Sequence, residues 1–565
     1  MLKNVFQKQS ILTELLEQSL ITEEEQAEIE AKMENENLSE MAAISKIVST
    51  NYNCLKFVAK HNNIDFISLK EVPKISNALL SEVPRNLITL YHILPFGYGA
   101  NNAEIRIASP DPLDSQIIEN LENRTNKKMI MFYASWSDID DAVTQYLGTS
   151  EAIEAATAYI ESLDGQAATG NIDLNDLTSD SPIVTIVDTL LQQAAKMKAS
   201  DIHIEPFENR LRIRYRIDGV LAEQPSYSMS LHAAIISRLK IMGGMDISEK
   251  RIPQDGRISF FMNKIEYDVR VSMLPTVYGE KCVMRLALRA NLQRDKKNLG
   301  LTDYDLKIFD RVFSNPNGII LVTGPTGSGK STTLYTALSE LSTEEVNVVT
   351  VEDPVEANVD GVNQVKTNDR AGLTFASALR SILRQDPDII MIGEIRDQET
   401  AEIAVQAAIT GHLVVSTLHT NSSAATVSRL VNMGLAPYLV ADSVVGIMAQ
   451  RLVRRLCPHC RKQRMATPEE LIELGVKKQG VQLPIYDAGK CGYCNNTGFS
   501  GRIAVYEIME VSPKIKDMIV DGARTSDIKE AAIANGMHTL HRSAAELVLR
   551  GTTTMSEMRK VSSEY

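Results

Sequence analysis

The fold is decided by one stretch of the chain, Gly318-Ile319-Ile320-Leu321-Val322-Thr323-Gly324-Pro325-Thr326-Gly327-Ser328-Gly329-Lys330-Ser331-Thr332. Its first six residues are rich in β-branched and apolar side chains and predict a buried strand, and the glycine-rich run leads into a helix from Thr332. From about residue 301 onward the pattern of strand, glycine loop and helix repeats. This order predicts an α/β fold with a parallel sheet covered by helices.

The glycine-rich run has the spacing of a phosphate-binding loop. Its glycines let backbone N–H groups close around phosphates, while Lys330 should bridge the β- and γ-phosphates and the Ser331 hydroxyl should ligate Mg²⁺. We assign the whole run to binding ATP: Gly324, Pro325, Thr326, Gly327, Ser328, Gly329, Lys330, Ser331 and Thr332. The alternative is a glycine turn without a ligand, and the strand before and the helix after the run argue against it.

Two further apolar runs end in carboxylates, which a nucleotide loop needs for holding metal and orienting water. The run Asp388–Glu394 has the shape of a Walker B element and places Glu394 near Mg²⁺ and the water. The run Val348–Glu356 offers Glu352 and Glu356 as general bases. Acidic residues at strand ends are also common in solvated loops, and that reading stays open for each.

Length and charge limit the class of protein. A chain of 565 residues should form three or four domains, and its 44% hydrophobic and 23% charged residues are typical of a folded protein. The formal net charge of −13 argues against nucleic acid as the main partner. A basic stripe keeps a nucleic-acid motor as a rival: Arg451, Arg454, Arg455, Arg461 and Lys462. With no apolar run near 20 residues and no signal peptide, we expect a cytosolic protein.

Composition divides the chain into four parts. Residues 1–147 predict a helical start followed by a small α/β module, and 148–180 predict a flexible linker. Residues 181–298 begin with a helix at Ser181-Pro182 and continue with alternating strands. One of these carries Arg210, Arg212, Arg214 and Arg216 on a single face, which favours a solvated surface. Residues 299–565 form the predicted motor, with an insertion at 457–494.

The insertion is bounded by two Cys-x-x-Cys pairs, Cys457/Cys460 and Cys491/Cys494. The intervening loop can bring both pairs to one tetrahedral centre, and four thiolates favour Zn²⁺ over Mg²⁺ or Ca²⁺. With every ligand position filled by sulfur, the ion should be structural. A disulfide or a redox pair is the alternative. Cys54 and Cys282 stand alone and receive no role.

Several motifs in order give the chain a family resemblance. They are the phosphate loop, Glu352-Asp353-Pro354-Val355-Glu356, Leu383-Arg384-Gln385-Asp386-Pro387-Asp388, Gly393-Glu394-Ile395-Arg396-Asp397, Thr410-Gly411-His412-Leu413 and Thr417-Leu418-His419-Thr420-Asn421. Over residues 180–565 the chain resembles the secretion ATPase superfamily, whose members drive type IV pilus assembly and type II secretion. The resemblance implies a RecA-like P-loop motor preceded by a PAS-like domain and a small N-terminal domain.

The resemblance also implies roles for single residues. An Asp box at 350–356 makes Glu356 the water activator, and a Walker B element at 388–394 makes Glu394 the metal partner; which glutamate is the base stays open. A His box at 410–421 makes His412 and His419 sensors of the γ-phosphate. Arginines of the preceding domain that would neutralise the transferred phosphoryl group are Arg257, Arg270 and Arg285.

The four cysteines and the long N-terminus resemble the extension or secretion branch of the family rather than the retraction branch. The N-terminal region resembles the family's N-domain in Val83-Pro84, Ile93-Leu94-Pro95 and Ala108–Leu113. Some relatives bind cyclic di-GMP there through a pattern beginning Arg-Leu-Gly. The aligned positions here are Ser10-Ile11-Leu12 and Ser19, so the arginine and both glycines are missing. We therefore expect no such dinucleotide site.

Together these observations predict a cytoplasmic ATPase, and the resemblance implies that it is a homohexamer at the inner face of the membrane. The resemblance implies an inner-membrane platform protein and a cytoplasmic docking protein as partners, with pilus assembly as the first interpretation and type II secretion as the alternative. A nucleic-acid motor and an ATP-binding regulator without turnover are the rivals from other classes.

Overall fold

The computed structural model describes residues 11–143, 157, 182–288, 295–476 and 482–562, apart from short gaps at 37, 73–74, 100–101, 225–226 and 263–264. The chain forms two compact units. One comprises Met1–Ala287 with Gly489–Gly498, and the other comprises Leu288–Ala488 with Phe499–Tyr565. The predicted linker at 148–180 lies almost wholly outside the described residues.

The N-terminal part begins with helices, as predicted, and continues as a small α/β module. The helical start consists of α1 (Ile11–Glu17), α2 (Glu23–Glu36), α3 (Glu40–Ile47) and α4 (Tyr52–His61). The module consists of α5 (Asn77–Glu82), α6 (Arg85–Tyr91), β1 (Leu94–Tyr98), β2 (Glu104–Ser109), α7 (Ser115–Thr125), β3 (Lys128–Tyr133) and α8 (Trp136–Val143). Its sheet has the order β1-β2-β3. Outside these strands, Phe66 forms an isolated bridge with Tyr133 at the end of β3.

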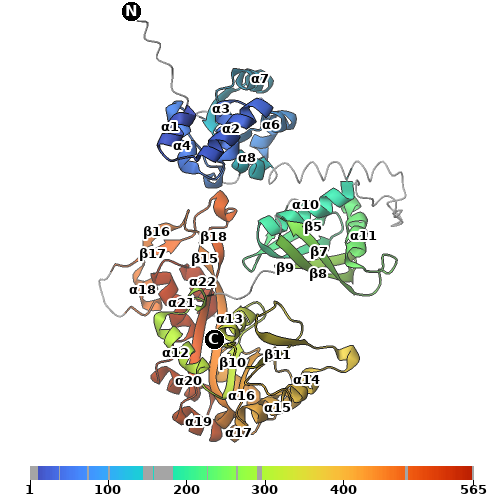
Figure 1. The fold of residues 1–565 in the computed structure, drawn as a ribbon, viewed down its shortest axis with the longest axis vertical. Coiled ribbons are helices and arrows are strands. Elements are labelled where there is room, and N and C mark those ends of the chain that lie inside the picture. The colour runs from blue at the N-terminus through green and yellow to red at the C-terminus, as the bar shows by residue number, and fades with distance from the viewer. Residues whose placement is uncertain are drawn as a thin grey trace, which may run out of the picture. The chain divides into compact units, whose positions relative to one another are not determined.

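Residues 182–288 form a six-stranded sheet with the order β6-β5-β4-β9-β8-β7. The elements are α10 (Pro182–Lys196), β4 (Ala199–Pro206), β5 (Leu211–Ile217), β6 (Val220–Glu223), α11 (His232–Gly243), β7 (Gln254–Met262), β8 (Ile265–Thr276) and β9 (Gly279–Leu288). The helix predicted to begin at Ser181-Pro182 is α10, and its apolar side chains are buried, with Ile183, Ile186 and Leu190 each 1% exposed. Helices α10 and α11 pack on one face of the sheet (Figure 1), and the hydrophobic core lies between these helices and the strands.

The predicted motor contains a seven-stranded sheet with the order β12-β11-β13-β14-β10-β15-β18. Its strands are β10 (Gly318–Thr323), β11 (Val348–Glu352), β12 (Val362–Lys366), β13 (Ile389–Ile392), β14 (Leu413–Leu418), β15 (Val444–Leu456) and β18 (Phe499–Glu510). All neighbouring pairs from β12 to β15 are parallel, and β18 is antiparallel to β15. The predicted parallel sheet is therefore confirmed.

Helices cover both faces of this sheet (Figure 1). They are α12 (Asp303–Phe313), α13 (Lys330–Leu341), α14 (Phe375–Ile382), α15 (Gln398–Ile409), α16 (Ser423–Asn432), α17 (Pro437–Ser443), α19 (Pro513–Val520), α20 (Thr525–Ala534), α21 (Leu540–Leu549) and α22 (Met555–Ser562). Because side chains alternate along a strand, Ile319 and Leu321 belong to the core shared with α14 and α15, while Ile320 and Val322 belong to the core shared with α12 and α13. A sheet buried on both faces explains the uninterrupted apolar runs in the sequence.

The insertion between β15 and β18 contains a small two-stranded sheet and a short helix. It contains β16 (Lys462–Met465), α18 (Pro468–Glu473) and β17 (Pro484–Asp487), and the two strands pair in antiparallel fashion. Throughout the described part of the chain, no helix is both long enough and apolar enough to cross a membrane.

Candidate functional site

The candidate site lies at one edge of the seven-stranded sheet. In parallel strands the carboxyl ends point the same way, so the segments that follow β10, β11, β13 and β14 meet there. These segments are the phosphate loop and the loops that carry Glu356, Glu394 and His419. Strand pairing thus brings together motifs that are far apart in the sequence.

The phosphate loop connects β10 to α13, which begins at Lys330, two residues earlier than predicted. Gly327 and Gly329 have φ angles of 80° and 91°, a region that glycine enters without the steric cost of a side chain. A Cβ on Gly329 would lie 2.9 Å from Gln450 Nε2. The buried Ser328 hydroxyl has no hydrogen-bond partner among the described residues. A loop with a free buried hydroxyl ahead of a helix N-terminus fits a phosphate ligand.

The Lys330 ammonium lies over the loop and donates to the carbonyl oxygens of Gly324 at 2.8 Å and Pro325 at 3.2 Å. Burial lowers its pKa; the Glu394 carboxylate opposes this shift, the Arg451 guanidinium adds to it, and Glu356 also opposes it. Glu394 and Glu356 follow β13 and β11 at the same sheet edge as this loop, within electrostatic reach of the ammonium. The structure thus brings Lys330, Glu356 and Glu394 together.

Glu394 follows β13 and contacts the His box. Its side chain is 18% exposed, accepts a hydrogen bond from Arg396 and lies 3.3 Å from His419 Nε2. Burial is the largest single effect and raises the pKa of Glu394. The hydrogen bonds and positive charges of Arg396 and His419 together outweigh burial, so the pKa lies below its ordinary value. The ionised Glu394 carboxylate and the Ser331 hydroxyl, which follow β13 and β10 at the same sheet edge, are oxygen ligands of the kind that suits Mg²⁺.

The two predicted histidines lie at opposite ends of β14. His419 follows the strand at the loop edge, whereas His412 precedes it, and the backbone of Gly318 at the start of β10 donates to the His412 carbonyl at 3.1 Å. The His412 ring lies 2.9 Å from the carbonyl oxygen of Ala407 at the end of α15. A strand of this length separates the two histidines by about 20 Å. Within one chain, His412 therefore lies at the sheet edge opposite the phosphate loop, whereas His419 lies at the loop edge.

The structure separates the two glutamates of the Asp box. Glu352 ends β11, is 4% exposed, and accepts hydrogen bonds from Thr350 at 2.7 Å, from Gln364 at 3.0 Å and from Tyr335. Glu356 lies four residues further on and is exposed. A buried carboxylate with three donors is held in place, while an exposed one near Lys330 can reach a water molecule. The geometry favours Glu356 as the base.

The three predicted arginines share one face of the six-stranded sheet. Arg257, Arg270 and Arg285 lie on β7, β8 and β9, and strand neighbours of theirs point into the opposite, helix-covered face: Ile258, Val269, Val271 and Met284. Arg257 lies directly opposite Arg270, an unfavourable pairing of like charges. The Arg270 Nε is buried and has no hydrogen-bond partner in the part of the chain that the structure describes, and Arg285 donates to Asp201 at 3.2 Å. This face can accept an anion.

The arginines of β5 lie on a partly exposed face of the sheet and pair with carboxylates. Arg212 and Arg214 both donate to Glu205, at 3.0 and 2.8 Å. Arg216 lies 3.5 Å from Asp201. These side chains are therefore committed to carboxylates of the same sheet.

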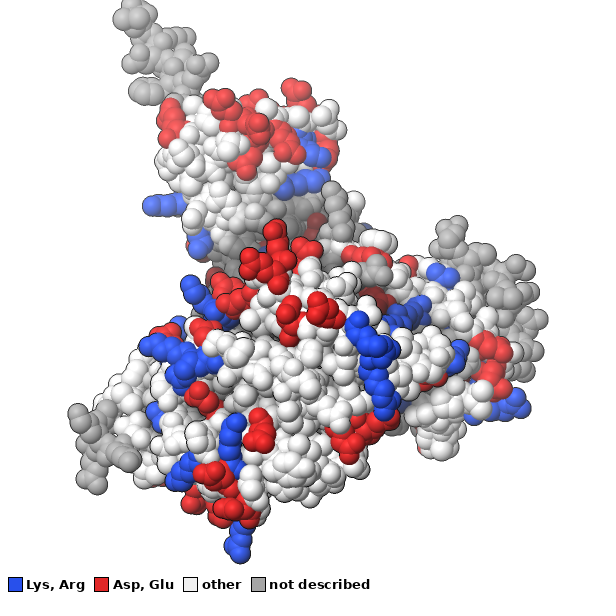
Figure 2. Space-filling model, turned by 60° about the horizontal axis from the view of Figure 1, so that its bottom comes forward, with Lys and Arg blue, Asp and Glu red and all other residues white. Residues whose placement is uncertain are grey.

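The predicted basic stripe is not a continuous basic surface. Arg451 is 6% exposed and donates to the backbone and side chain of Asn421 at 3.3 and 3.1 Å, inside the motor. Arg454 donates to Glu557 at 2.8 Å and lies over the Phe499 ring. On the face drawn in Figure 2, basic and acidic side chains are interspersed. Arg451, beside the phosphate loop, is a site residue that the local sequence did not reveal.

The four cysteines of the insertion converge as predicted. Their sulfur atoms all lie within 4.8 Å of one another, and Cys491 Sγ and Cys494 Sγ are 3.7 Å apart. Tetrahedral zinc with bonds of about 2.3 Å would separate its sulfurs by about 3.8 Å. The Gly498 N–H donates to Cys494 Sγ at 3.2 Å. No disulfide joins any of the six cysteines, all of which lie in the described part of the chain, and the set of four sulfur donors fits Zn²⁺.

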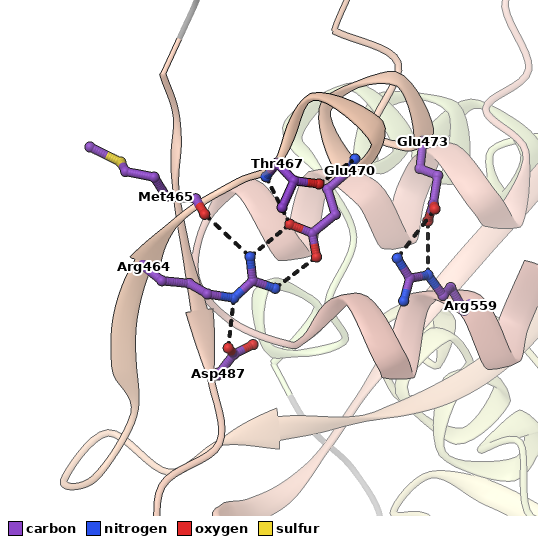
Figure 3. Close-up of polar contacts among 7 residues, drawn as sticks. All are labelled: Arg464, Met465, Thr467, Glu470, Glu473, Asp487 and Arg559. Atoms are coloured by element: carbon purple, nitrogen blue, oxygen red, sulfur yellow. Dashed lines mark hydrogen bonds and ion pairs between the residues drawn. The ribbon is translucent and has the colours of Figure 1, made fainter.

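Between the cysteine pairs, Arg464 links two strands and a short helix through ion pairs (Figure 3). Arg464 on β16 donates to Asp487 on β17 at 2.6 Å and to both Glu470 oxygens on α18 at 2.7 Å. Glu470 also accepts from the Thr467 backbone N–H at 3.0 Å, and Thr467 caps the same helix. These contacts fold the insertion back on itself, which the convergence of the two cysteine pairs requires.

Comparison with known proteins identifies the family. Residues 176–560 match the family described as type II/IV secretion system protein, and residues 62–153 match the MshEN domain. The chain is also similar in fold to the crystal structure of the Yersinia pseudotuberculosis ATPase DotB, with a TM-score of 0.50 and 21% identity, over 68% of this chain and 94% of that chain.

Two curated relatives align along most of the chain. The type IV pilus assembly ATPase PilB of Myxococcus xanthus is 42% identical and covers 89% of each chain. The type II secretion system protein E of Xanthomonas campestris is 43% identical over 84% of this chain and 83% of its own. These matches confirm the resemblance drawn from the motifs: the chain belongs to the type II/IV secretion system protein family and is an ATP hydrolase.

Proposed function

We propose that this protein is a cytoplasmic homohexameric ATPase, bound to the inner face of the membrane, that powers type IV pilus assembly. It would act through an inner-membrane platform protein and a cytoplasmic docking protein. The observation that carries the catalytic part is the meeting of the phosphate loop, Glu356, Glu394 and His419 at one sheet edge. The alignment of a pilus assembly relative along 89% of the chain supports the biological part.

In the proposed reaction, Lys330 leaves the loop carbonyls and binds the β- and γ-phosphates of ATP. The Ser331 hydroxyl and Glu394 would hold Mg²⁺, which supplies positive charge between the phosphates. Glu356 accepts the proton of the attacking water, since it is exposed while Glu352 is committed to its donors. His419 orients Glu394 through their 3.3 Å contact.

We further propose that residues 181–298 form a PAS-like domain that completes the site, and that residues 299–565 form a RecA-like motor. Arg257, Arg270 and Arg285 would neutralise charge that develops on the transferred phosphoryl group. Their shared sheet face, with a buried Arg270 Nε that lacks a partner, supports an anionic ligand. Hydrolysis would then move one domain against the other.

Type II secretion is the second candidate function, supported by a relative of similar identity, 43% against 42%. Deleting the gene and assaying pili and secreted proteins in the same strain tests the choice. We expect loss of pili with normal protein release. Loss of protein release with intact pili and twitching would overturn pilus assembly and favour type II secretion.

The rivals from other classes can be tested on purified protein. Stimulation of ATP hydrolysis by DNA but not by the platform protein would favour a nucleic-acid motor. Equal phosphate release by wild type and Lys330→Ala would favour an ATP-binding regulator without turnover at this loop.

We also propose that the N-terminal region binds no cyclic di-GMP by the family's motif. Ser19 has a φ angle of 56°, a left-handed conformation that favours the glycine of that motif. Titration calorimetry with cyclic di-GMP should give no binding heat, and saturable binding would contradict this proposal.

A further inference from the structure

Tyr335 links the phosphate loop's helix to the Asp box. It lies on α13, five residues after Lys330, and its side chain is buried at 1% exposure. Its hydroxyl donates to Glu352 at the end of β11 and accepts the backbone N–H of Glu356 at 3.2 Å. A tyrosine hydroxyl can serve both partners because it is donor and acceptor at once. Burial raises the pKa of Tyr335 far above the working range, so the proton stays available for donation.

Glu352 fixes the hydroxyl in this arrangement. Its carboxylate is 4% exposed and also accepts from Thr350 Oγ1 at 2.7 Å and Gln364 Nε2 at 3.0 Å. A buried carboxylate is costly without donors, and three donors from α13, β11 and β12 supply them. Glu352 is therefore an anchor rather than a base.

Gln364 holds the same loop at two further points. Its amide nitrogen donates to the Ala357 carbonyl at 3.0 Å, and its amide oxygen accepts the Val359 N–H at 2.8 Å. The backbone of 356–359 is thus attached at three places, once to the buried Tyr335 and twice to the half-buried Gln364. Only the attachment at Glu356 itself comes from the helix that begins with Lys330.

We propose that Tyr335 is a positioning residue for ATP hydrolysis, whose hydroxyl sets the place of Glu356 relative to the phosphate-bound helix. This inference rests on the proposed role of Glu356 as the base. When α13 shifts with the phosphates, the hydroxyl carries the Glu356 backbone with it, and the carboxylate keeps its distance to the water. A displacement of about 1 Å in a reacting group can cost about 100-fold in rate.

Tyr335→Phe removes this hydroxyl and keeps the buried ring. We expect kcat to fall about 10-fold while the KM for ATP stays within about 2-fold, because the phosphate contacts are intact. Amide exchange at Glu356 should accelerate, since its N–H loses its acceptor. The matched control is Tyr304→Phe, which removes another tyrosine hydroxyl of the motor, bonded to the Gly536 carbonyl at 2.9 Å. Its kcat should equal that of wild type.

A double variant distinguishes a positioning role of Tyr335 from a structural defect caused by its substitution. In a Glu356→Gln protein, adding Tyr335→Phe should leave the residual rate unchanged, because the hydroxyl acts through Glu356. An unchanged kcat in Tyr335→Phe, or losses that multiply in the double variant, would overturn the positioning role. If Glu356→Gln itself retains the wild-type rate, the proposed base is wrong and this inference falls with it. A large loss in Glu356→Gln with none in Tyr335→Phe overturns only the inference.

Discussion

The sheet edge and the four-cysteine insertion are both built from polar groups, but they differ in how completely those groups are satisfied. At the sheet edge, the buried Ser328 hydroxyl has no partner within the described ranges, and the Lys330 ammonium donates to loop carbonyls. In the insertion, four sulfurs converge on one another and Arg464 binds two carboxylates. The first region has bonding capacity left for a ligand that changes, whereas the second is closed around its own groups.

This difference indicates which measurement each region should affect. Substitutions at the sheet edge should reduce turnover and leave folding intact, because the groups are not yet committed to the fold. Substitutions in the insertion should reduce stability and leave the chemistry of the motor intact, because no ligand position remains open.

The largest effect is expected at the open site. Lys330→Ala should lower kcat for ATP by at least about 1,000-fold, since it removes a charge that contacts the transferred phosphoryl group. Phosphate release measures the rate, and circular dichroism should match wild type. Lys307→Ala, at an exposed lysine on α12, is the control and should keep full activity. Loss of the fold in Lys330→Ala would contradict this difference between the two regions, because Lys330 would then be needed for stability rather than for binding ATP.

The next largest effect tests the closed region. Cys457→Ser should abolish zinc binding and unfold the insertion locally, because structural zinc contributes folding free energy of about 10 kcal/mol in small modules. Elemental analysis of the reduced, purified protein measures the metal, and amide exchange at residues 462–465 measures the unfolding.

The control for the cysteine is Cys282→Ala, at a buried cysteine on β9 that lies outside the insertion. It should retain one zinc per chain. Wild-type protein that contains no zinc would rule out a structural metal in the insertion, whatever the variants do.

The sequence could predict whatever depends on neighbouring residues. The strand at Gly318–Thr323, the loop after it and the cysteine pairs are local patterns, and the structure contains each of them. The roles of Glu352 and Glu356 could not be separated in this way. Their difference arises from Tyr335 and Gln364, which come from other elements.

Two other residues show the same limit. Arg451 reads as part of a basic run because its neighbours are basic, and only packing against Asn421 shows it to be buried. His412 could have been placed from the sequence. The apolar run Leu413–Leu418 between the two histidines predicts a strand, and the two ends of a strand lie at opposite edges of a sheet.

The two histidines therefore make a matched test of the sheet edge. His419→Ala should lower kcat about 10-fold, because it removes the 3.3 Å contact with Glu394. The effect is limited because the His419 side chain is 52% exposed. His412→Ala should lower the rate of the isolated chain by less than about 2-fold, because its ring caps α15. A larger loss in His412→Ala that depends on protein concentration would instead indicate that His412 acts on a neighbouring copy.

The smallest expected effect distinguishes two ion pairs on one short helix (Figure 3). Glu470 binds Arg464 with both oxygens and its side chain is 11% exposed, whereas Glu473 binds Arg559 and is 39% exposed. Glu470→Gln should weaken the insertion by about 1 kcal/mol, and Glu473→Gln by less than about 0.5 kcal/mol. Glutamine can still cap the helix at position 470, so the difference reports the charge rather than the cap. Amide exchange in β16 and β17 measures both.

The Arg464–Glu470 ion pair should also make the stability of the insertion depend on pH. Arg464 lowers the pKa of Glu470 from its ordinary 4.5 to about 2, although burial acts against it. A carboxylate whose pKa is lowered in the folded state stabilises above its unfolded value and loses that contribution as the pH falls toward the folded value. The gap in exchange protection between wild type and Glu470→Gln should therefore be constant above about pH 6 and shrink progressively below about pH 5. A gap that stays constant down to about pH 3 would show that Arg464 holds the insertion through shape and not through the ionised carboxylate.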